Sequence, residues 1–250
     1  MYSSDHSCIV FCPYFDFYDI SVYSISYDYL KEDLNQAVLS LKDILKAKNI
    51  TSFNKVKFAV CCKGEFKETP LYKVIEELNF EKINSIARFN AHGKEYDESI
   101  LEFVPEEFRK VEYAQVEDAQ RILDLFLDNF DPAGDSLPEL SDIIENIKKK
   151  QVVCVKDAAK NNQVICFHYF EVINNIFYGL YDCTDKEYRK DFVYYSILYW
   201  NTEQTKHNNV KYARSYGWRD VTKTRLNKFG KDLNQTADGV LFHNYKYPLI

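Results

Sequence analysis

The segment Cys183–Trp200, "CTDKEYRKDFVYYSILYW", connects an apolar strand-like run to an aromatic-rich helix through a short charged loop. Arg189 and Lys190 lie in this loop, and their side chains can reach an anionic ligand. The N-terminus of the helix behind them presents backbone N–H groups of the kind that bind phosphates. Glycine, which lets a backbone approach a phosphate closely, is missing from the segment. The segment therefore predicts a strand–loop–helix unit that is either an anion site without glycine or a structural turn.

The elements around this segment are predicted from hydrophobic periodicity, capping residues and turn residues. After a short strand, "VEYAQ", apolar residues at helical spacing predict two amphipathic helices, and Ser136 with Glu139 forms a capping-box pattern for the second. A three-stranded meander follows, and then a helix, a strand, a second helix and a last strand. These elements are expected at about 151–156, 163–172, 175–183, 191–207, 209–217, 219–229 and 238–246.

The N-terminal part of the chain repeats part of this order. It has a hairpin, a long amphipathic helix, a buried strand, a short helix that starts at Thr69 and Pro70, and a final strand. The same order recurs from residue 163 onward, which predicts two related halves. The N-terminal elements are expected at about 8–15, 18–27, 29–47, 55–62, 71–78 and 80–89.

Strands and helices in this order predict an α/β fold with a mixed sheet, of the α+β kind. The N-terminal half is expected to occupy residues 1–92. Residues 93–110 are polar and charged with scattered apolar anchors, which indicates a connection. The C-terminal half is expected to occupy residues 111–250 and to be the more complete, because it alone has the opening strand and two helices.

Composition and charge argue against several classes of protein. The chain has 250 residues, of which 46% are hydrophobic and 28% charged, and its formal net charge is −6. An acidic chain without a basic face is a poor nucleic-acid binder, because neutralising phosphates requires clustered Lys and Arg. No apolar run is long enough to span a bilayer, and the first residues lack a signal-peptide pattern, so we expect no membrane association.

The seven cysteines are expected to be buried, reduced thiols of a cytoplasmic protein. Their number is odd, most lie in apolar strand-like segments, and none forms a C-x-x-C pair. No His lies at zinc-ligand spacing from a pair of cysteines, so no metal site is predicted.

In the order of its elements, Val111–Ile250 resembles the GNAT family of N-acyltransferases. In letters the resemblance is carried by "DKEYRKDF" (185–192) and "NKFG" (227–230). The N-terminal half resembles the later part of the same fold, and its "PLYKVIEELNFEK" is similar to the family's usual helix ending. The chain is thus similar to tandem GNAT proteins, which implies a degenerate N-terminal scaffold and a C-terminal acyltransferase domain.

The resemblance implies that acetyl-CoA or another acyl-CoA is the donor and binds at the opening loop. The family pattern Q/R-x-x-G-x-G/A falls on the six residues that begin with Arg189, where Phe192 and Tyr194 replace the small residues. Asp191 adds a negative charge at the helix N-terminus, which repels an anion. The residues implied to contact the cofactor are Asp182, Thr184, Arg189, Lys190, Asp191, Val193 and Tyr194.

Acyl transfer to an amine, the chemistry that the resemblance implies, needs a base for the amine and an acid for the leaving thiolate. Glu171, at the end of a strand, is the first candidate for the base, and His168 is the second. The two are three apart in a strand, so they are expected to face opposite sides of the sheet. The family's usual acid is a Tyr on the last helix, which is Leu226 here, and Tyr181 is a candidate replacement.

The expected reaction is transfer of an acyl group to an amine of a small molecule or sugar, with Trp218 and Arg219 near the substrate. An acyl carrier protein or an aminoacyl group is an alternative donor. The rival from another class is a non-catalytic binding or assembly module, which the replaced glycines and the missing Tyr favour. A Fem-type aminoacyl-tRNA-dependent transferase is disfavoured by the shortness and acidity of the chain, and a homodimer is left open.

Overall fold

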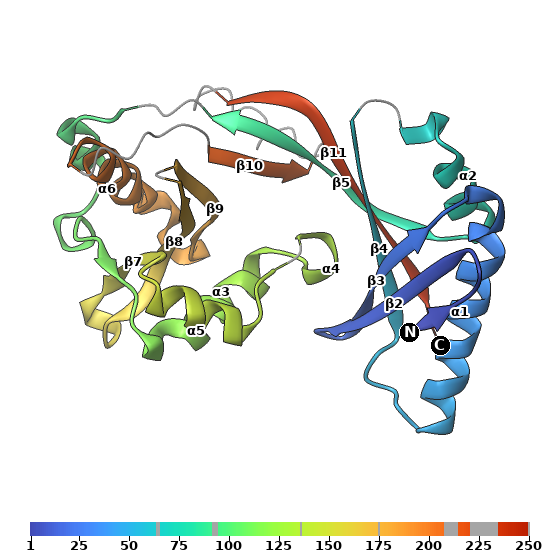
Figure 1. Ribbon diagram of the computed structural model, residues 1–250. Coiled ribbons are helices and arrows are strands. Elements are labelled where there is room, and N and C mark those ends of the chain that lie inside the picture. The colour runs from blue at the N-terminus through green and yellow to red at the C-terminus, as the bar shows by residue number, and fades with distance from the viewer. Residues whose placement is uncertain are drawn as a thin grey trace.

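Two β-sheets organise the chain in the computed structural model, which describes residues 1–63, 66–91, 95–135, 137–174, 176–207, 215–220 and 235–249 (Figure 1). The larger sheet has seven strands, in the spatial order β1 (Tyr2–Ser3), β2 (Ser7–Tyr14), β3 (Phe17–Ser24), β4 (Lys55–Lys63), β11 (Gln235–Pro248), β5 (Glu81–Ala91) and β10 (Ser215–Asp220). The smaller sheet has four strands, in the order β6 (Glu112–Tyr113), β7 (Val152–Asp157), β8 (Gln163–Ile173) and β9 (Ile176–Thr184). Residues 1–91 are called the N-terminal half below, and residues 95–249 the C-terminal half.

Two helices, α1 (Tyr27–Ala47) and α2 (Pro70–Glu77), pack on the larger sheet in the N-terminal half (Figure 1). Ser26 and Thr69 are their N-caps, and each side chain accepts a hydrogen bond from a backbone N–H of the first turn. The cap at Thr69 with proline behind it confirms the predicted helix start. One apolar core joins both helices to the strands, and its members include Ile9, Ile20, Leu34, Leu41, Phe58, Val60 and Ile75.

The larger sheet is mixed, as predicted, because β3 and β4 run parallel whereas their outer neighbours are antiparallel. β3 pairs with β4 only where Phe17–Asp19 meets Lys55–Lys57. Beyond these residues the two strands separate, although β3 keeps its partner β2 and β4 keeps its partner β11.

The smaller sheet lies between two layers of helix in the C-terminal half. α3 (Ala119–Asn129) and α5 (Leu140–Lys148) pack on one face, and α6 (Tyr194–His207) packs on the other. The strands bury both faces, and this explains why β7 and β8 are almost continuously apolar. The connection between the halves includes a 3-10 helix, η2 (Glu98–Phe103), which lies against α6.

The last strands of the chain belong to the larger sheet. β11 lies between β4 and β5 and pairs with both in antiparallel orientation, and β10 pairs with the far edge of β5 (Figure 1). The predicted division into residues 1–92, 93–110 and 111–250 stays a prediction. The strand pairing shows, however, that its C-terminal part supplies the central strand of the N-terminal sheet.

A buried amide ties the two halves together. The side chain of Asn244, only 2% exposed, donates to Asn84 Oδ1 and to the carbonyl oxygen of Gly134, both at 2.8 Å. Gly134 lies on the short helix α4 (Pro132–Asp135), and a Cβ there would come within 2.5 Å of Asn84 Nδ2. A larger residue at position 134 would therefore have to displace the Asn84 side chain, whose oxygen accepts the hydrogen bond from Asn244.

Several local expectations differ from the structure. "DPAGD" was expected as a loop but forms α4. The capping box of α5 uses Glu139 and Asp142, whereas the predicted cap Ser136 lies outside the described residues. None of the seven cysteines is in a disulfide, yet Cys12 and Cys61 are exposed rather than buried. The predicted helix at 219–229 lies almost entirely outside the described residues. None of the described helices has the length and apolar character of a bilayer span.

Replacing Asn244 by Ala should lower the free energy of unfolding by about 2–3 kcal/mol, because Asn84 Oδ1 and the Gly134 carbonyl would both lose a donor. Urea denaturation followed by circular dichroism measures the change. Lys246→Ala, two residues along the same strand with a half-exposed side chain, is the matched control and should change stability by less than about 0.5 kcal/mol. Equal effects of the two substitutions would contradict the role given to the buried amide.

Candidate functional site

The first candidate site lies where β9 and β10 are neighbours without a strand ladder between them (Figure 1). In the described residues β9 pairs with β8 and β10 pairs with β5, so the two sheets meet at this point but do not join. We call this place the C-terminal divergence. In the described residues, the edge of β9 that faces β10 therefore forms no ladder with another strand, and such an edge is a place where a ligand can pair with backbone.

A bulge in β9 interrupts the sheet beside this divergence. The register with β8 passes from Tyr169–Tyr181 to Phe170–Gly179, which leaves Leu180 without a partner residue. A bulge frees the backbone groups of its extra residue and is common next to functional sites. Leu180 is thus the point of β9 at which the backbone has the most freedom to contact a bound group.

The predicted cofactor loop follows β9 directly. It forms a 3-10 helix, η6 (Lys186–Asp191), and α6 begins at Tyr194. The guanidinium of Arg189 donates to the Thr184 carbonyl oxygen at 3.4 Å and also to Asn129 Oδ1. Arg189 therefore links β9 to the end of α3 in this arrangement, and these two bonds use two of the five N–H donors of its guanidinium.

Phe192 stands where the family pattern has its first glycine, and its backbone has the left-handed conformation that glycine favours (φ 52°). Its ring is 47% exposed and packs against Tyr195 at 5.4 Å and Phe103 at 6.4 Å between ring centroids. The backbone shape of a glycine loop is thus present, but an aromatic side chain lies beside it. The following residue, Val193, is fully buried in the core under α6.

Other predicted cofactor contacts are distributed around the same turn. Lys190 is exposed and Asp191 half-buried at the end of η6. The Thr184 hydroxyl lies 3.2 Å from the thiol of Cys166, and Tyr194 packs beside the core under α6.

His168 and Asp182 form a pair across β8 and β9. Their Cα atoms are register partners, and the Asp182 carboxylate accepts a hydrogen bond from Nδ1 of His168. The His168 ring stacks with Phe170 and Phe177, and its Nε2 is buried without a partner. Burial of this nitrogen separates it from any solvent-borne acceptor, so a catalytic role of His168 stays a prediction that this geometry does not favour.

Glu171 lies on the opposite face from His168, as expected from their spacing. Tyr169, two residues earlier, packs in the core under α3 and α5, and the half-buried Glu171 follows on the same side of β8. Burial raises the pKa of Tyr169, and the nearby carboxylates of Asp142 and Glu171 raise it further. Glu171 is therefore the better placed of the two predicted bases for contact with solvent.

Tyr181 is a packing residue with a polar contact to α4. Its hydroxyl donates to the Asp135 carbonyl oxygen at 3.2 Å, and its ring lies 5.1 Å from that of Phe126. Burial, and then the charge of Asp135, raises its pKa to about 12. A phenol with this pKa stays protonated at neutral pH, so Tyr181 can act as an acid but not as a base.

Trp218 and Arg219 are in β10, where their backbones pair with Arg88 and Ala87 of β5. Their side chains lie outside what the structure describes, so their predicted contact with substrate stays a prediction.

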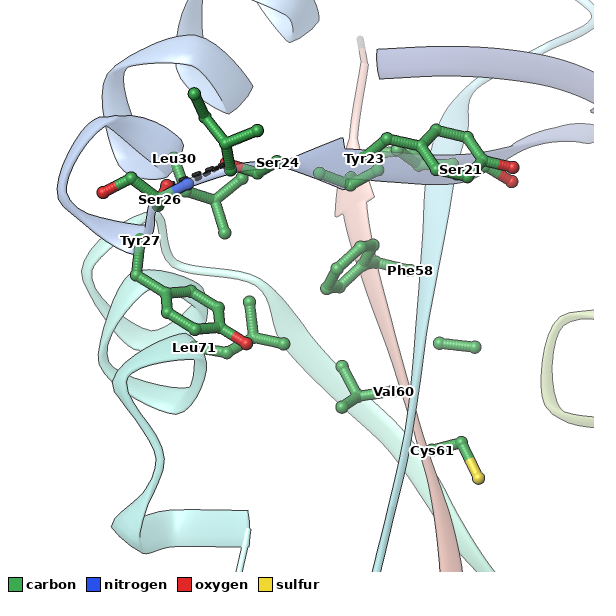
Figure 2. Close-up of a pocket in the computed structure, with 14 residues that line it drawn as sticks. Ser21, Tyr23, Ser24, Ser26, Tyr27, Leu30, Phe58, Val60, Cys61 and Leu71 are labelled. Atoms are coloured by element: carbon green, nitrogen blue, oxygen red, sulfur yellow. Dashed lines mark hydrogen bonds between the residues drawn. The ribbon is translucent and has the colours of Figure 1, made fainter. Parts of the chain in front are cut away.

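A second divergence, between β3 and β4, encloses a cavity of about 520 Å³ that the sequence did not indicate (Figure 2). It lies between Ile20–Ser24 of β3 and Phe58–Cys61 of β4, next to the start of α1 and to Leu71 of α2. The repeat of elements was the available signal, because β3 and α1 occupy the same places in the N-terminal order as β9 and α6 in the C-terminal one.

Known proteins match this chain in structure but not in sequence. No family model and no curated protein matches the chain. A GCN5-related N-acetyltransferase from Sphaerobacter thermophilus superposes with a TM-score of 0.59 at 6% identity, over 97% of this chain and 76% of that one. A tandem GNAT protein from the clavulanic acid biosynthesis pathway superposes with a TM-score of 0.56 at 7% identity, over 94% and 76%.

A third structure is similar over almost the whole chain. It is a conserved protein from Enterococcus faecalis V583, described as a probable N-acyltransferase, with a TM-score of 0.62 at 10% identity over 98% of this chain and 59% of that one. The chain has the GNAT fold. The GNAT similarity extends over both halves, and it includes a tandem protein among the matched structures.

Within the GNAT fold observed here, the predicted strand, loop and helix are present in the C-terminal half as β9, η6 and α6. The strand that follows, β10, diverges from β9 and pairs with β5. The differences from the family pattern are local. The aromatic ring of Phe192 stands at a glycine position, and Arg189 is hydrogen-bonded to Asn129.

Replacing Phe192 by Gly should leave the protein more stable than replacing it by Ala, by about 1 kcal/mol, because only glycine adopts φ 52° without strain. Both variants lose the same aromatic contacts, so their difference isolates the backbone. The free energy of unfolding in urea is the measurement. Equal stability of the two variants would show that the left-handed backbone is not retained once the ring is removed.

Proposed function

We propose that the chain is an N-acyltransferase that moves an acyl group from an acyl-CoA, or a related thioester, to an amine of a small molecule or sugar. The observation that carries this proposal is the C-terminal divergence, where a bulged β9 leads through η6 into the N-terminus of α6. Two similar structures, one described as an N-acetyltransferase and one as a probable N-acyltransferase, support the same class of reaction.

The edge of β9 that faces β10 fits the amide-bearing arm of a thioester donor, because such an arm hydrogen-bonds with backbone as a strand does. The loop fits a pyrophosphate less well, since Arg189 is bound to Asn129 and the Phe192 ring lies beside the left-handed turn. When bound, the donor supplies an electrophilic carbonyl and a thiolate leaving group. The nitrogen of the amine forms a bond to that carbonyl carbon, and the carbon–sulfur bond breaks.

The residues of the chain have defined tasks in this proposal. Glu171, the base, accepts a proton of the attacking amine, directly or through water. Tyr181, which stays protonated at neutral pH, is the acid candidate for the departing sulfur. Arg189 and Lys190 bind the phosphates, and Trp218 and Arg219 lie on the acceptor side.

A non-catalytic binding or assembly module is the second candidate function. The hydrogen bond of Arg189 to Asn129 favours it, because this bond gives part of the guanidinium a structural role within the chain. An acyl carrier protein as donor is a variant of the enzyme proposal and would present its thioester without the nucleotide part of CoA.

Arg189→Ala should weaken CoA binding at least about tenfold, or 1.4 kcal/mol, because a charged contact to phosphate is lost. Isothermal titration calorimetry with CoA and acetyl-CoA measures the affinity. Lys73→Ala, on an exposed face of α2 in the other half, removes the same charge and is the matched control, expected to leave the affinity unchanged. Equal affinity of the Arg189 variant and the unmodified protein would contradict the loop assignment.

Phe192→Gly should tighten CoA binding relative to the unmodified protein, because it opens the turn without altering its backbone angle. The same titration detects the change, and Phe103→Leu, which alters the neighbouring aromatic contact but not the turn, is the control. Failure of both the unmodified protein and this variant to bind CoA would favour the carrier-protein donor or the binding module.

A further inference from the structure

The cavity in the N-terminal half has two strand edges as its walls. β3 and β4 pair through Asp19 and Lys57 and then separate, so the facing edges of Ile20–Ser24 and Phe58–Lys63 carry no ladder between them. Apart from the ladders with β2 and β11, no backbone group in the described part of the chain bonds to Ile20–Ser24 or to Phe58–Cys61. Facing strand edges with open donors and acceptors are a template for an added strand.

The cavity lining carries no charged side chain, although it is rich in small hydroxyl residues (Figure 2). Phe58 and Val60 belong to the core under α1 and α2, and the alternate residues Ala59 and Cys61 face the other side of the sheet. An occupant therefore meets apolar groups on one side and small groups on the other.

The surroundings of the cavity disfavour a polyanion. α1 begins beside it, and the charged residue of its first turn is Asp28, which opposes the attraction of the helix N-terminus for anions. Lys31, one turn further on, is paired with Glu77 at 2.7 Å. The site thus differs in charge from the loop of the C-terminal half, where Arg189 and Lys190 lie together.

The mouth of the cavity is apolar and exposed. Tyr23 is 68% exposed, Ile25 83% and Tyr27 54%, and all three line the cavity. Large exposed apolar side chains around an opening indicate a contact surface that extends beyond the cavity itself. This surface suits an occupant that is longer than the cavity.

We propose that the divergence of β3 and β4 binds an uncharged segment of another polypeptide, in extended conformation, as a strand added between them. The open edge Ile20–Ser24 is about 16 Å long, so it accommodates roughly five residues. The preferred segment alternates apolar and small polar side chains, with the apolar ones toward Phe58 and Val60. This site is separate from the proposed acyltransferase site and does not depend on it.

The test uses Cys61 as a reporter, because its exposed thiol lines the cavity. Cys8→Ser, Cys12→Ser and Cys62→Ala together leave Cys61 as the one cysteine that is not buried. Its alkylation by iodoacetamide, followed by intact mass, is measured with acetyl-Ser-Val-Ser-Val-Ser-amide as the probe. At about ten times the Kd of the peptide, alkylation should slow about tenfold, because only the free cavity reacts.

The matched control is the same peptide with N-methylated valines, which keeps the side chains but removes two backbone donors and should not protect Cys61. Protection by CoA, equal protection by the N-methylated peptide, or no protection up to the solubility limit of the probe would each overturn the proposal.

A second arm uses calorimetry on variants of the full chain. Ala59→Phe fills the cavity and should abolish heat from the peptide, whereas Leu39→Phe, on an exposed position about three turns along α1, should not. CoA titration of the Ala59 variant separates the two proposals, since blocking the peptide site should leave CoA affinity unchanged. Peptide binding that survives Ala59→Phe would place the peptide elsewhere and overturn this assignment.

Discussion

The antiparallel pairing of β5 with β11 is the constraint on which the rest of the architecture depends. These two long strands lie side by side as the central pair of the order β4-β11-β5-β10, although 143 residues separate the end of β5 from the start of β11 in the sequence. β4 pairs with the outer edge of β11, and β10 pairs with the outer edge of β5. In the order β4-β11-β5-β10, the strands of the N-terminal half (β4 and β5) thus alternate with those of the C-terminal half (β11 and β10). Within this group, every strand pairs with strands of the other half.

This arrangement explains why two divergences exist. β4 and β10 are each held on one side by the central pair, whereas β3 and β9 are each held by the meander of their own half. Where the two groups of strands meet, the sheet opens: partly between β3 and β4, and wholly between β9 and β10 in the described residues. The two divergences differ in the charge of the side chains beside them. Arg189 and Lys190 lie in the loop after β9, whereas Asp28 lies in the first turn of α1.

The sequence was sufficient for elements whose signal is local. The spacing of apolar residues in α1, the cap at Thr69 before Pro70, and the two successive strand-like runs of the β2–β3 hairpin all predicted elements that the structure contains. The opposite orientations of His168 and Glu171 also followed from a period of two residues. The resemblance to GNAT proteins correctly indicated the fold from element order, despite identities near 10% to the matched structures.

Other features depend on contacts between distant parts of the chain, so they could not be predicted from local sequence. Nothing local in "GVLFHNYKY" says that β11 inserts between β4 and β5, because strand pairing over such a distance leaves no periodic signal. The His168–Asp182 contact depends on the register of β8 with β9, and the bond from Arg189 to Asn129 joins residues from separate elements. The cavity between β3 and β4 depends on where a parallel ladder stops, which side-chain patterns do not encode.

The position of β11 has a consequence for biosynthesis. The ribosome makes β4 and β5 early, but the strand that belongs between them is made only after the whole four-stranded sheet and α6. Until then the nascent N-terminal half exposes two unpaired strand edges, which is a state prone to association with other chains. The larger sheet can therefore close only late in translation, and we expect cells to need chaperones that shield β4 and β5 during that interval.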